Sequence, residues 1–431
     1  MHQVDLSLKE ITKVEGAATL DVVVKNDKVE KCEFGIAEFK RFYTQAMRGK
    51  PYAAIPQLLA RICGTCSNAH LLCSIESVEK ALGIVPSQQS SLLKKLTMNG
   101  LMIRDHALHL YLFAMPDMYG KDAFLDFDES DPQQHQHLHD AFDIKAAGNA
   151  LSIAVAGRSV HALYPNIGGF NQTPNKEEID EVIKKLKDIR PAVLRLIKTF
   201  EDCKFVFDRE THFMSIVCNP YGYLEGMIKD DHGNTITESE YRQHLEHVVI
   251  PYSQASGYEH ERQPYMVGSL ARINLSRDSL PEATKKDAAS ALSKFPSTNI
   301  FHNNLAQAIE VLQAVDESLN ILENTTFAKE ELIKPTRKSG IGVGVIEAPR
   351  GTLYHKVEIG EDGKVIKGEI VVPTGQNQIN IEVDLKRRIE ELLPTDITKE
   401  GLQLEMERLI RAYDPCMSCA SHFLKINLDK I

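Results

Sequence analysis

Two cysteine pairs near opposite ends of the chain carry the clearest chemistry in this sequence. Each pair has the spacing C-x-x-C and is followed within four residues by a histidine, giving Cys63, Cys66 and His70 at one end and Cys416, Cys419 and His422 at the other. A C-x-x-C turn directs two sulfurs at one metal centre. Two pairs supply four thiolates, which suit one soft transition metal or a bridged pair of metals. The sequence therefore predicts a metal site built from both ends of the chain.

A structural zinc site is the main alternative for four cysteines, because Zn²⁺ is commonly held by four thiolates in a closed tetrahedron. Three observations favour a redox-active or catalytic metal instead. The two pairs are about 350 residues apart, whereas structural zinc usually staples short segments. Each pair has a histidine placed to donate a hydrogen bond to sulfur. The second pair follows Asp414-Pro415, and proline stiffens the approach to it.

Composition excludes several functions. The chain has 431 residues, 43% of them hydrophobic and 26% charged, which is typical of a globular protein. Its net charge of -10 disfavours a nucleic-acid partner. The sequence contains no apolar stretch of membrane-spanning length and no signal peptide. Thiols used as metal ligands fit a reducing compartment, so we predict a cytoplasmic protein, although a subunit exported together with a partner would have the same features.

The pattern of apolar residues predicts an α+β fold that is mostly helical, with small peripheral sheets. Strands are predicted at 17–24, 28–36, 353–360 and 364–373. Helices are predicted within 52–113 and at 140–162, 176–203, 284–294, 303–324, 379–393 and 398–412. The polar segment 205–265 is predicted to be an irregular insertion. Because the metal site needs both chain ends, we expect one integrated domain spanning 1–431.

The cysteine motifs and their order along the chain resemble those of the large subunit of nickel–iron hydrogenases. The first motif matches R-x-C-G-x-C-x-x-x-H and the second D-P-C-x-x-C-x-x-H. Further segments are similar to landmarks of that family and occur in the family order: 11–16, 103–109, 166–170, 268–274, 347–351 (Glu-Ala-Pro-Arg-Gly) and 373–377 (Pro-Thr-Gly-Gln-Asn). The resemblance covers nearly the whole chain, and it implies the fold of these large subunits.

The resemblance implies a nickel ion bound by all four cysteines, and an iron that carries cyanide and carbon monoxide. Cys63 and Cys416 would be terminal nickel ligands, while Cys66 and Cys419 would bridge to iron. The implied reaction is the reversible heterolytic cleavage of H2. A terminal thiolate keeps a free lone pair, so it can accept the proton.

The resemblance also assigns roles to side chains that do not bind metal. Glu15 would relay the proton from Cys416, although a carboxylate beside a turn glycine is also compatible with a simple structural role. Arg350 would lie over the iron ligands and the open coordination position, held by Asp105 and Asp414. The remaining members of the implied site are His70, which would donate to a bridging sulfur, and Pro373 and Thr374, whose segment would bind a cyanide.

Other residues that could bind metal match no position of the family site. Burial as inert thiols is predicted for four cysteines: Cys32, Cys73, Cys203 and Cys218. The alternating histidines His135, His137 and His139 are predicted to lie in a polar loop.

Two features depart from the family pattern. Thr44 stands where the family usually has a glutamate that binds magnesium near the C-terminal histidine, here His422. A threonine is a weak neutral ligand, so the magnesium site is expected to be weakened or altered. Family precursors are usually cut after that histidine, whereas this sequence continues to Ile431. The tail 423–431 is either natural to this branch, which we favour, or marks an unprocessed chain.

The chain has no further cysteine cluster for Fe–S electron relays. The resemblance therefore implies a small Fe–S subunit as partner, with further electron-transfer subunits, and the sequence around the first motif is closest to the cytosolic, cofactor-coupled branch. Two alternatives remain open: a hydrogen sensor, and a non-catalytic homologue of the quinone-site subunit of respiratory complex I. The complex I subunit has lost the cysteines, so their presence here disfavours the second alternative.

Overall fold

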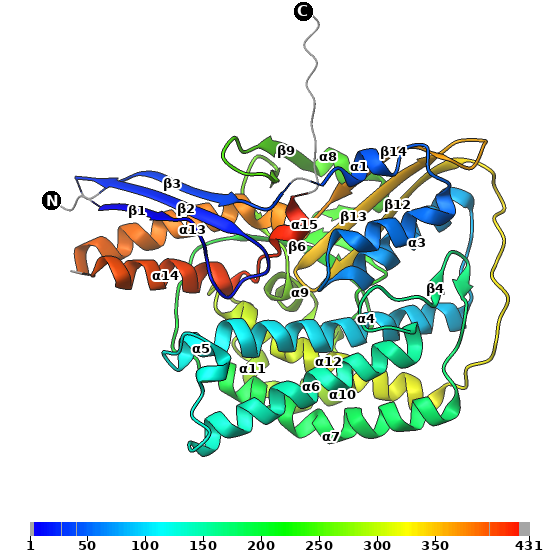
Figure 1. Cartoon of the computed structure of the whole chain (residues 1–431), viewed down its shortest axis with the longest axis horizontal. Coiled ribbons are helices and arrows are strands. Elements are labelled where there is room, and N and C mark those ends of the chain that lie inside the picture. Colours follow the sequence, from blue (N-terminus) through cyan, green and yellow to red (C-terminus); the bar gives the residue numbers. More distant parts are fainter. Residues whose placement is uncertain (1–3, 27, 40, 396, 422–431) are drawn as a thin grey trace, which may run out of the picture.

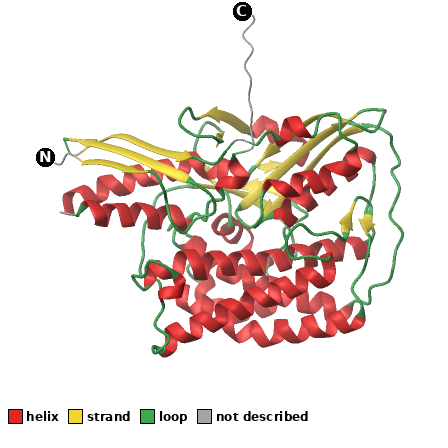
Figure 2. Ribbon diagram, in the orientation of Figure 1, coloured by secondary structure: helices red, strands yellow, loops and turns green. Residues whose placement is uncertain are grey.

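Long helices pack together on one side of the molecule, and small sheets lie on the other (Figures 1 and 2). The computed structural model describes residues 4–26, 28–39, 41–395 and 397–421. The helical layer is built from α4 (Gln88–Leu108), α6 (Pro132–Ala156), α7 (Lys176–Glu201) and α12 (His302–Asn324). Helix α12 contacts α4 and α7, and α6 also contacts α4 and α7. The predicted mostly helical fold with small sheets is confirmed.

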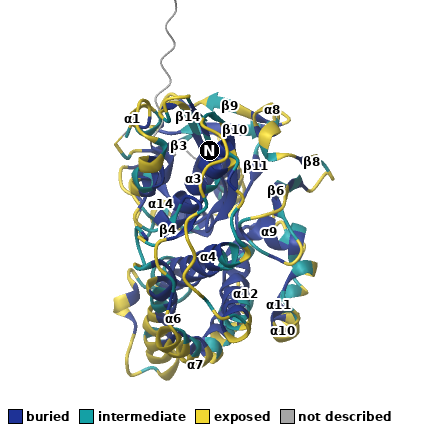
Figure 3. Ribbon diagram, turned by 90° about the vertical axis from the view of Figure 1, so that its right-hand side faces the viewer, coloured by how far each residue is buried: buried dark blue, intermediate teal, exposed yellow. Residues whose placement is uncertain are grey.

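Local sequence signals explain where these helices begin. Asn175 and Glu178 form a capping box at the start of α7, each side chain accepting a hydrogen bond from the other residue's backbone N–H. Asp131 caps α6 directly before Pro132, the first helical residue. In Figure 3 the outer face of α7 is exposed, whereas α4 and α12 are largely buried. Helix α7 therefore covers the helical layer, and α12 lies inside it.

Helix α3 (Ser67–Leu82) packs on a three-stranded antiparallel sheet of β12 (Gly340–Ala348), β13 (Gly351–Ile359) and β14 (Val365–Val371). Alternate glycines on β12 allow close approach. A Cβ added at Gly342 would lie 2.0 Å from the Ser77 carbonyl oxygen, and one at Gly344 would lie 2.3 Å from that of Cys73. The sequence predicts the β13–β14 hairpin but not β12. This packing places the start of α3 near the turn between β12 and β13.

The two ends of the chain meet beside a second sheet, formed by β1 (Val4–Leu8), β2 (Ala18–Lys25) and β3 (Lys28–Ile36). Helices α13 (Pro373–Leu392) and α14 (Lys399–Ala412) pack against this sheet and each other. The short helix α15 (Met417–Ala420) follows, and the Met417 N–H donates to the Glu15 carbonyl oxygen at 2.9 Å. The loop after β1 and the second cysteine motif therefore lie side by side (Figure 1).

The segment 205–265 is more regular than predicted. It contains most of a four-stranded sheet with the order β11-β6-β7-β8, formed by β6 (His212–Val217), β7 (Met227–Asp230), β8 (Thr235–Ile236) and β11 (Tyr265–Met266). A separate hairpin pairs β9 (Leu245–Val249) with β10 (Ser256–His260). Strands of two to six residues give little periodic signal, and the parallel pairing of β6 with β11 joins residues about 50 positions apart.

The remaining elements are short. They are α1 (Tyr43–Ala46), α2 (Ile55–Leu59), α5 (Met115–Met118), β4 (Pro165–Asn166), β5 (Gly169–Phe170), α8 (Tyr241–His244), α9 (Ser269–Ser276), α10 (Glu282–Asp287) and α11 (Ala289–Leu292). Within the described parts of the chain, we find no helix with the length and hydropathy to cross a bilayer.

Candidate metal centre

Four cysteine sulfurs converge in the interior of the protein, as the sequence predicts. The Sγ atoms of Cys63 and Cys416 are 3.4 Å apart, those of Cys66 and Cys419 are 3.1 Å apart, and those of Cys416 and Cys419 are 3.0 Å apart. All four residues are buried, and their sulfurs lie within 4.8 Å of one another. These separations exceed a disulfide bond of about 2.05 Å, so the site consists of four free thiols arranged around one point.

The backbone directs the sulfurs inward at the starts of two helices. Cys66 precedes α3, and Cys416 precedes α15 in an extended conformation. Asp414, with φ of +51°, turns the chain after α14, and Pro415 follows it. Because a helix N-terminus carries partial positive charge, α3 favours the thiolate form of Cys66.

Glu15 contacts the second cysteine motif directly. Its Oε2 atom lies 2.9 Å from Cys416 Sγ and accepts a hydrogen bond from the Ser418 N–H at 3.1 Å. Burial raises the pKa of Glu15, and the neighbouring Cys63 thiolate adds to the rise. Gly16, with φ of +81°, lets the loop approach closely, because a Cβ there would lie 2.8 Å from that of Met417. The carboxylate is therefore held at hydrogen-bond distance from one sulfur.

Arg350 lies between two buried carboxylates. Its Nη1 atom is 2.7 Å from Asp105 Oδ2, and its Nη2 atom is 2.9 Å from Asp414 Oδ1. Although burial alone lowers the pKa of Arg350, Asp105 and Asp414 raise it well above its ordinary value. Arg350 Nε and Asp105 Oδ1 have no hydrogen-bond partner among the described residues. The cation is therefore fixed in place while part of its donor capacity stays unused.

A small cavity separates Arg350 from the sulfurs. Polar groups reach it from Arg350, His70 and Thr374, and its remaining wall is apolar except for three of the cysteines: Ala348, Pro349, Leu353, Pro373, Cys66, Cys416 and Cys419. The Thr374 hydroxyl oxygen accepts a hydrogen bond from the Cys416 N–H at 2.9 Å, which leaves the hydroxyl hydrogen free to donate. The cavity therefore offers hydrogen-bond donors in an apolar space beside the sulfurs.

His70 touches a sulfur from the other side. Its Nε2 atom is 3.5 Å from Cys419 Sγ, and its Nδ1 atom is 3.1 Å from His355 Nε2. Burial lowers the pKa of His70 to about 4, so the ring is neutral at neutral pH. A neutral ring can donate from Nε2 to sulfur only if Nδ1 accepts from His355. His355, on β13, was not predicted as part of the site, and no local sequence signal identifies it.

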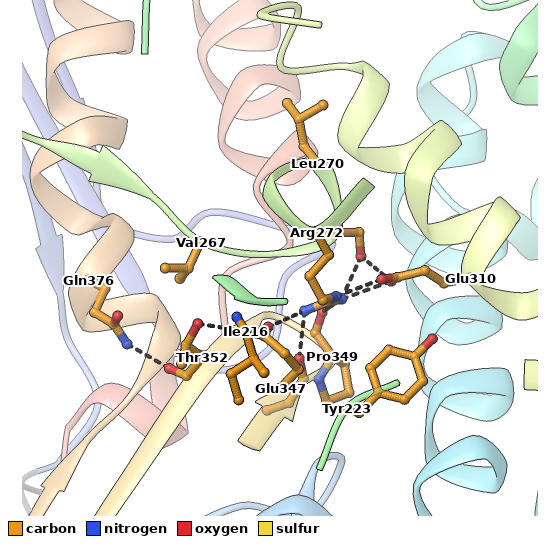
Figure 4. Close-up of polar contacts among 12 residues, drawn as sticks. Ile216, Tyr223, Val267, Leu270, Arg272, Glu310, Glu347, Pro349, Thr352 and Gln376 are labelled. Carbon is orange, nitrogen blue, oxygen red and sulfur yellow. Dashed lines mark hydrogen bonds and ion pairs between the residues drawn. The ribbon is translucent and has the colours of Figure 1, made fainter. Parts of the chain in front are cut away.

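A buried ion-pair network supports the turn that carries Arg350 (Figure 4). Arg272, on α9, donates to Glu310 on α12 at 2.6 Å and to Glu347 on β12 at 2.8 Å. It also donates to the backbone carbonyls of Ala348 and Pro349, directly before Arg350. Although burial raises the pKa of Glu310, Arg272 lowers it far below its ordinary range. The roles of Arg272 and Glu310 were missed, although the motif at 268–274 pointed to this segment.

The network continues to the helix that carries Thr374. The Glu347 carboxylate accepts hydrogen bonds from the Ile216 N–H and the Thr352 hydroxyl, and the Thr352 carbonyl accepts from the Gln376 side chain (Figure 4). Gln376 lies on the first turn of α13, two residues after Thr374. Arg350 and Thr374 are therefore positioned by one connected set of buried polar contacts.

The remaining predicted residues lie elsewhere. His422 and the tail 423–431 are outside the described residues, and Thr44 lies on α1. The run that contains His135, His137 and His139 was predicted to be a loop, which is wrong: it lies on α6, and His137 is buried against Tyr119. The asparagine-like periodicity of polar residues there hid the helix start at Asp131. The other cysteines do not join the four-sulfur cluster, namely Cys32, Cys73, Cys203 and Cys218.

The donor set fits a nickel–iron centre. Four buried thiolates suit soft or borderline metals and disfavour magnesium or calcium. The apolar cavity beside three of the sulfurs has room for small ligands, and the unused donors of Arg350 and Thr374 point to electron-rich ones. A closed structural zinc site needs neither a cavity nor a buried guanidinium.

Comparison with protein families gives a match to the model described as nickel-dependent hydrogenase, over residues 43–188 and 237–422. Sulfhydrogenase 2 subunit alpha of Pyrococcus furiosus is 31% identical over 423 residues, covering 98% of this chain and 100% of the relative. The NAD-reducing hydrogenase HoxS subunit beta of Cupriavidus necator is 28% identical over 472 residues, covering 97% of this chain and 95% of the relative.

Solved structures show the same fold. A crystal structure of an NAD⁺-reducing [NiFe]-hydrogenase in its H2-reduced state superposes with a TM-score of 0.84 at 23% identity, covering 97% of this chain and 99% of that one. The [NiFeSe]-hydrogenase of Dm. baculatum gives a TM-score of 0.76 at 21% identity, covering 98% and 100%. The match over nearly full length in each agrees with a metal site assembled from both chain ends.

Proposed function

This chain belongs to the nickel-dependent hydrogenase family as a catalytic large subunit, and from that premise we propose how its residues handle the proton released from H2. The observation that carries the proposal is the contact of Glu15 with one of four converging buried sulfurs, 2.9 Å from Cys416 Sγ. A nickel–iron centre bound by the four cysteines would polarise H2 and accept its electrons. Every other step below belongs to side chains of this chain.

Cys416 and Glu15 form the proton path. A thiolate sulfur that keeps a lone pair can take the proton as H2 is cleaved, and a carboxylate at hydrogen-bond distance can remove it. The Ser418 N–H fixes the carboxylate in position, so the transfer needs no rearrangement. Glu15 lies on the loop between β1 and β2, outside the metal-binding motifs, and connects the buried sulfur with the N-terminal part of the chain.

Arg350, Thr374 and His70 would act on the ligand environment. We propose that iron carries cyanide and carbon monoxide, because the cavity beside the sulfurs is apolar and its donors, the Arg350 guanidinium and the Thr374 hydroxyl, suit a cyanide nitrogen. Asp105 and Asp414 would keep Arg350 over this cavity. His70 would donate a hydrogen bond to Cys419 and lower the charge density on that sulfur.

The chain needs a partner that accepts electrons. Among the described residues, the cysteines outside the metal centre form no cluster that could hold an Fe–S relay. The relatives are named as subunits, and those named NAD-reducing or F420-non-reducing transfer electrons through larger assemblies. We therefore propose a small Fe–S subunit, with further electron-transfer subunits, and a cytoplasmic location for the complex. The magnesium ion proposed near His422 would be held weakly, because Thr44 replaces a charged ligand.

Two other functions share parts of this site. A hydrogen sensor would have the same residues, and turnover rate distinguishes it from an enzyme. A non-catalytic homologue of the complex I quinone-site subunit would not need four converging thiols with an adjacent carboxylate. The complete cysteine set therefore supports the catalytic function over the second alternative.

The test is H2-dependent dye reduction by the anaerobically purified complex. Cys416→Ser should abolish activity. Cys73→Ser is the matched control, because Cys73 is also a buried free cysteine but donates to the Gly344 carbonyl, outside the metal centre. The isolated chain should reduce no dye without its Fe–S partner. Turnover that survives in Cys416→Ser, or its absence from the intact wild-type complex, would contradict the proposal.

A further inference from the structure

A second group of metal-binding side chains lies at the surface, far along the sequence from the four cysteines. Ligand atoms of His212, Asp231 and His232 all lie within 4.8 Å of one another. His212 begins β6, and the other two residues form the turn between β7 and β8. The family match covers 43–188 and 237–422, so all three residues lie in the stretch that it omits. We propose that this group binds a divalent transition metal ion of the zinc class.

The orientation of His212 favours a ligand role. Its Nε2 atom is 2.7 Å from the side-chain oxygen of Gln263, and an amide oxygen can only accept a hydrogen bond. His212 therefore carries its proton on Nε2, which leaves the Nδ1 lone pair free. Metal-binding histidines commonly donate their other ring N–H to a carbonyl or carboxylate oxygen in this way. Nδ1 faces the Asp231 carboxylate at 3.9 Å, too far for a hydrogen bond.

These separations fit a shared ion after small side-chain rotations. Metal–ligand bonds of about 2.1 Å place neighbouring ligands of a tetrahedral zinc roughly 3.4 Å apart. The His212 and His232 rings are 4.2 Å apart between centroids, in an edge-to-face arrangement. A fourth donor is near, since Glu261 Oε2 lies 3.9 Å from His232 Nδ1. Two imidazoles and two carboxylates form a donor set typical of Zn²⁺ and unsuited to Mg²⁺.

The backbone around these side chains is well fixed. The buried Asp230 carboxylate accepts hydrogen bonds from the backbone N–H groups of His232 and Asn234, and it also contacts His260 Nε2 at 2.9 Å. The Asp231 N–H donates to the Phe213 carbonyl oxygen. Side chains of the group remain partly accessible, with exposures of 27% for His212 and 46% for His232. Figure 3 shows β8 projecting at the edge of the molecule, so an ion can enter from solvent.

A bound ion would join three segments that are separate in sequence. It would link the first residue of β6, the β7–β8 turn and, through Glu261, the turn after β10. The donor arrangement does not involve the buried cysteines, so loading of this surface site should not depend on nickel or iron.

The experiment titrates Zn²⁺ into the purified, chelator-washed complex by calorimetry. We expect one surface site with a dissociation constant in the micromolar range or below. His232→Ala should weaken binding at least tenfold, and Asp231→Asn should weaken it in the same direction. Gln263→Leu should weaken binding about tenfold through the orientation of His212. An excess of Mg²⁺ should not compete.

The control is a double variant of another exposed histidine pair, His135→Ala with His139→Ala. Their rings are 4.6 Å apart, one turn apart on α6. This variant should keep the high-affinity site, and anomalous scattering at the zinc edge should place the ion between His212 and His232. Zinc binding that is absent, unchanged in His232→Ala, or lost in the α6 variant would overturn the proposal.

Discussion

Replacing Glu15 with glutamine tests the proton path at a single atom. Glu15 Oε2 is 2.9 Å from Cys416 Sγ, and among the described residues no other carboxylate is hydrogen-bonded to that sulfur. Glutamine keeps the shape and can still accept from the Ser418 N–H through its amide oxygen, but it cannot accept and release a proton. The metals should therefore stay bound in Glu15→Gln while proton transfer fails.

The size of the effect follows from the contact. A positioned general acid or base contributes roughly 100- to 10,000-fold to a rate. Because the contact with Cys416 is direct, we expect Glu15→Gln to slow exchange between D2 and water protons at least about 100-fold. The assay is mass spectrometry of HD and H2 formed by the complex under D2, which does not require electron transfer to a partner.

Glu38→Gln is the matched control. Glu38 lies near the same loop, where its carboxylate accepts a hydrogen bond from the Ala17 N–H at 3.1 Å, and the structure gives it no contact with a cysteine. Its exchange rate should stay within about twofold of wild type, because its carboxylate is not in the proton path. Near-normal exchange in Glu15→Gln, with nickel and iron retained, would assign the relay to another group.

Three further predictions concern stability and ion binding. Arg272→Met leaves the buried Glu310 unpaired and should cost about 3–5 kcal/mol, whereas Arg190→Met, at a partly exposed pair, should cost under about 1 kcal/mol; equal drops in melting temperature would contradict this. Burial raises the pKa of Glu382 to about 7, so the folded chain holds its proton more tightly than the unfolded chain and stability falls as pH rises from about 4.5 to 7. Glu382→Gln should therefore raise the melting temperature at pH 8 but not at pH 4, and the reverse pattern would exclude this assignment. Thr44→Glu should increase the magnesium retained after dialysis, measured by elemental analysis, and unchanged retention would remove Thr44 from the site.

The sequence predicts features that depend on neighbouring residues. The capping box of Asn175 and Glu178 marks the start of α7, and Glu361-Asp362-Gly363 marks the turn between β13 and β14. The convergence of the two cysteine pairs is also confirmed, because the metal requirement and the family order both point to it.

Features that depend on contacts between distant segments are not predictable in this way. The pairing of His355 with His70 joins residues 285 positions apart, and Arg272 reaches Glu347 across 75 positions. Neither contact leaves a periodic pattern. The short strands of 205–265 are defined by pairing rather than by their own sequences, and the β12 glycines weaken the strand signal because they serve the packing of α3.

Metal analysis combined with infrared spectroscopy tests the central claim most directly. The complex, purified without oxygen, should contain nickel and iron in equal amounts and show absorption bands from cyanide and carbon monoxide bound to iron. Cys419→Ser should lose these bands, whereas Cys73→Ser should keep them. Zinc alone in the four-cysteine site of H2-oxidising protein, with no such bands, would contradict the account.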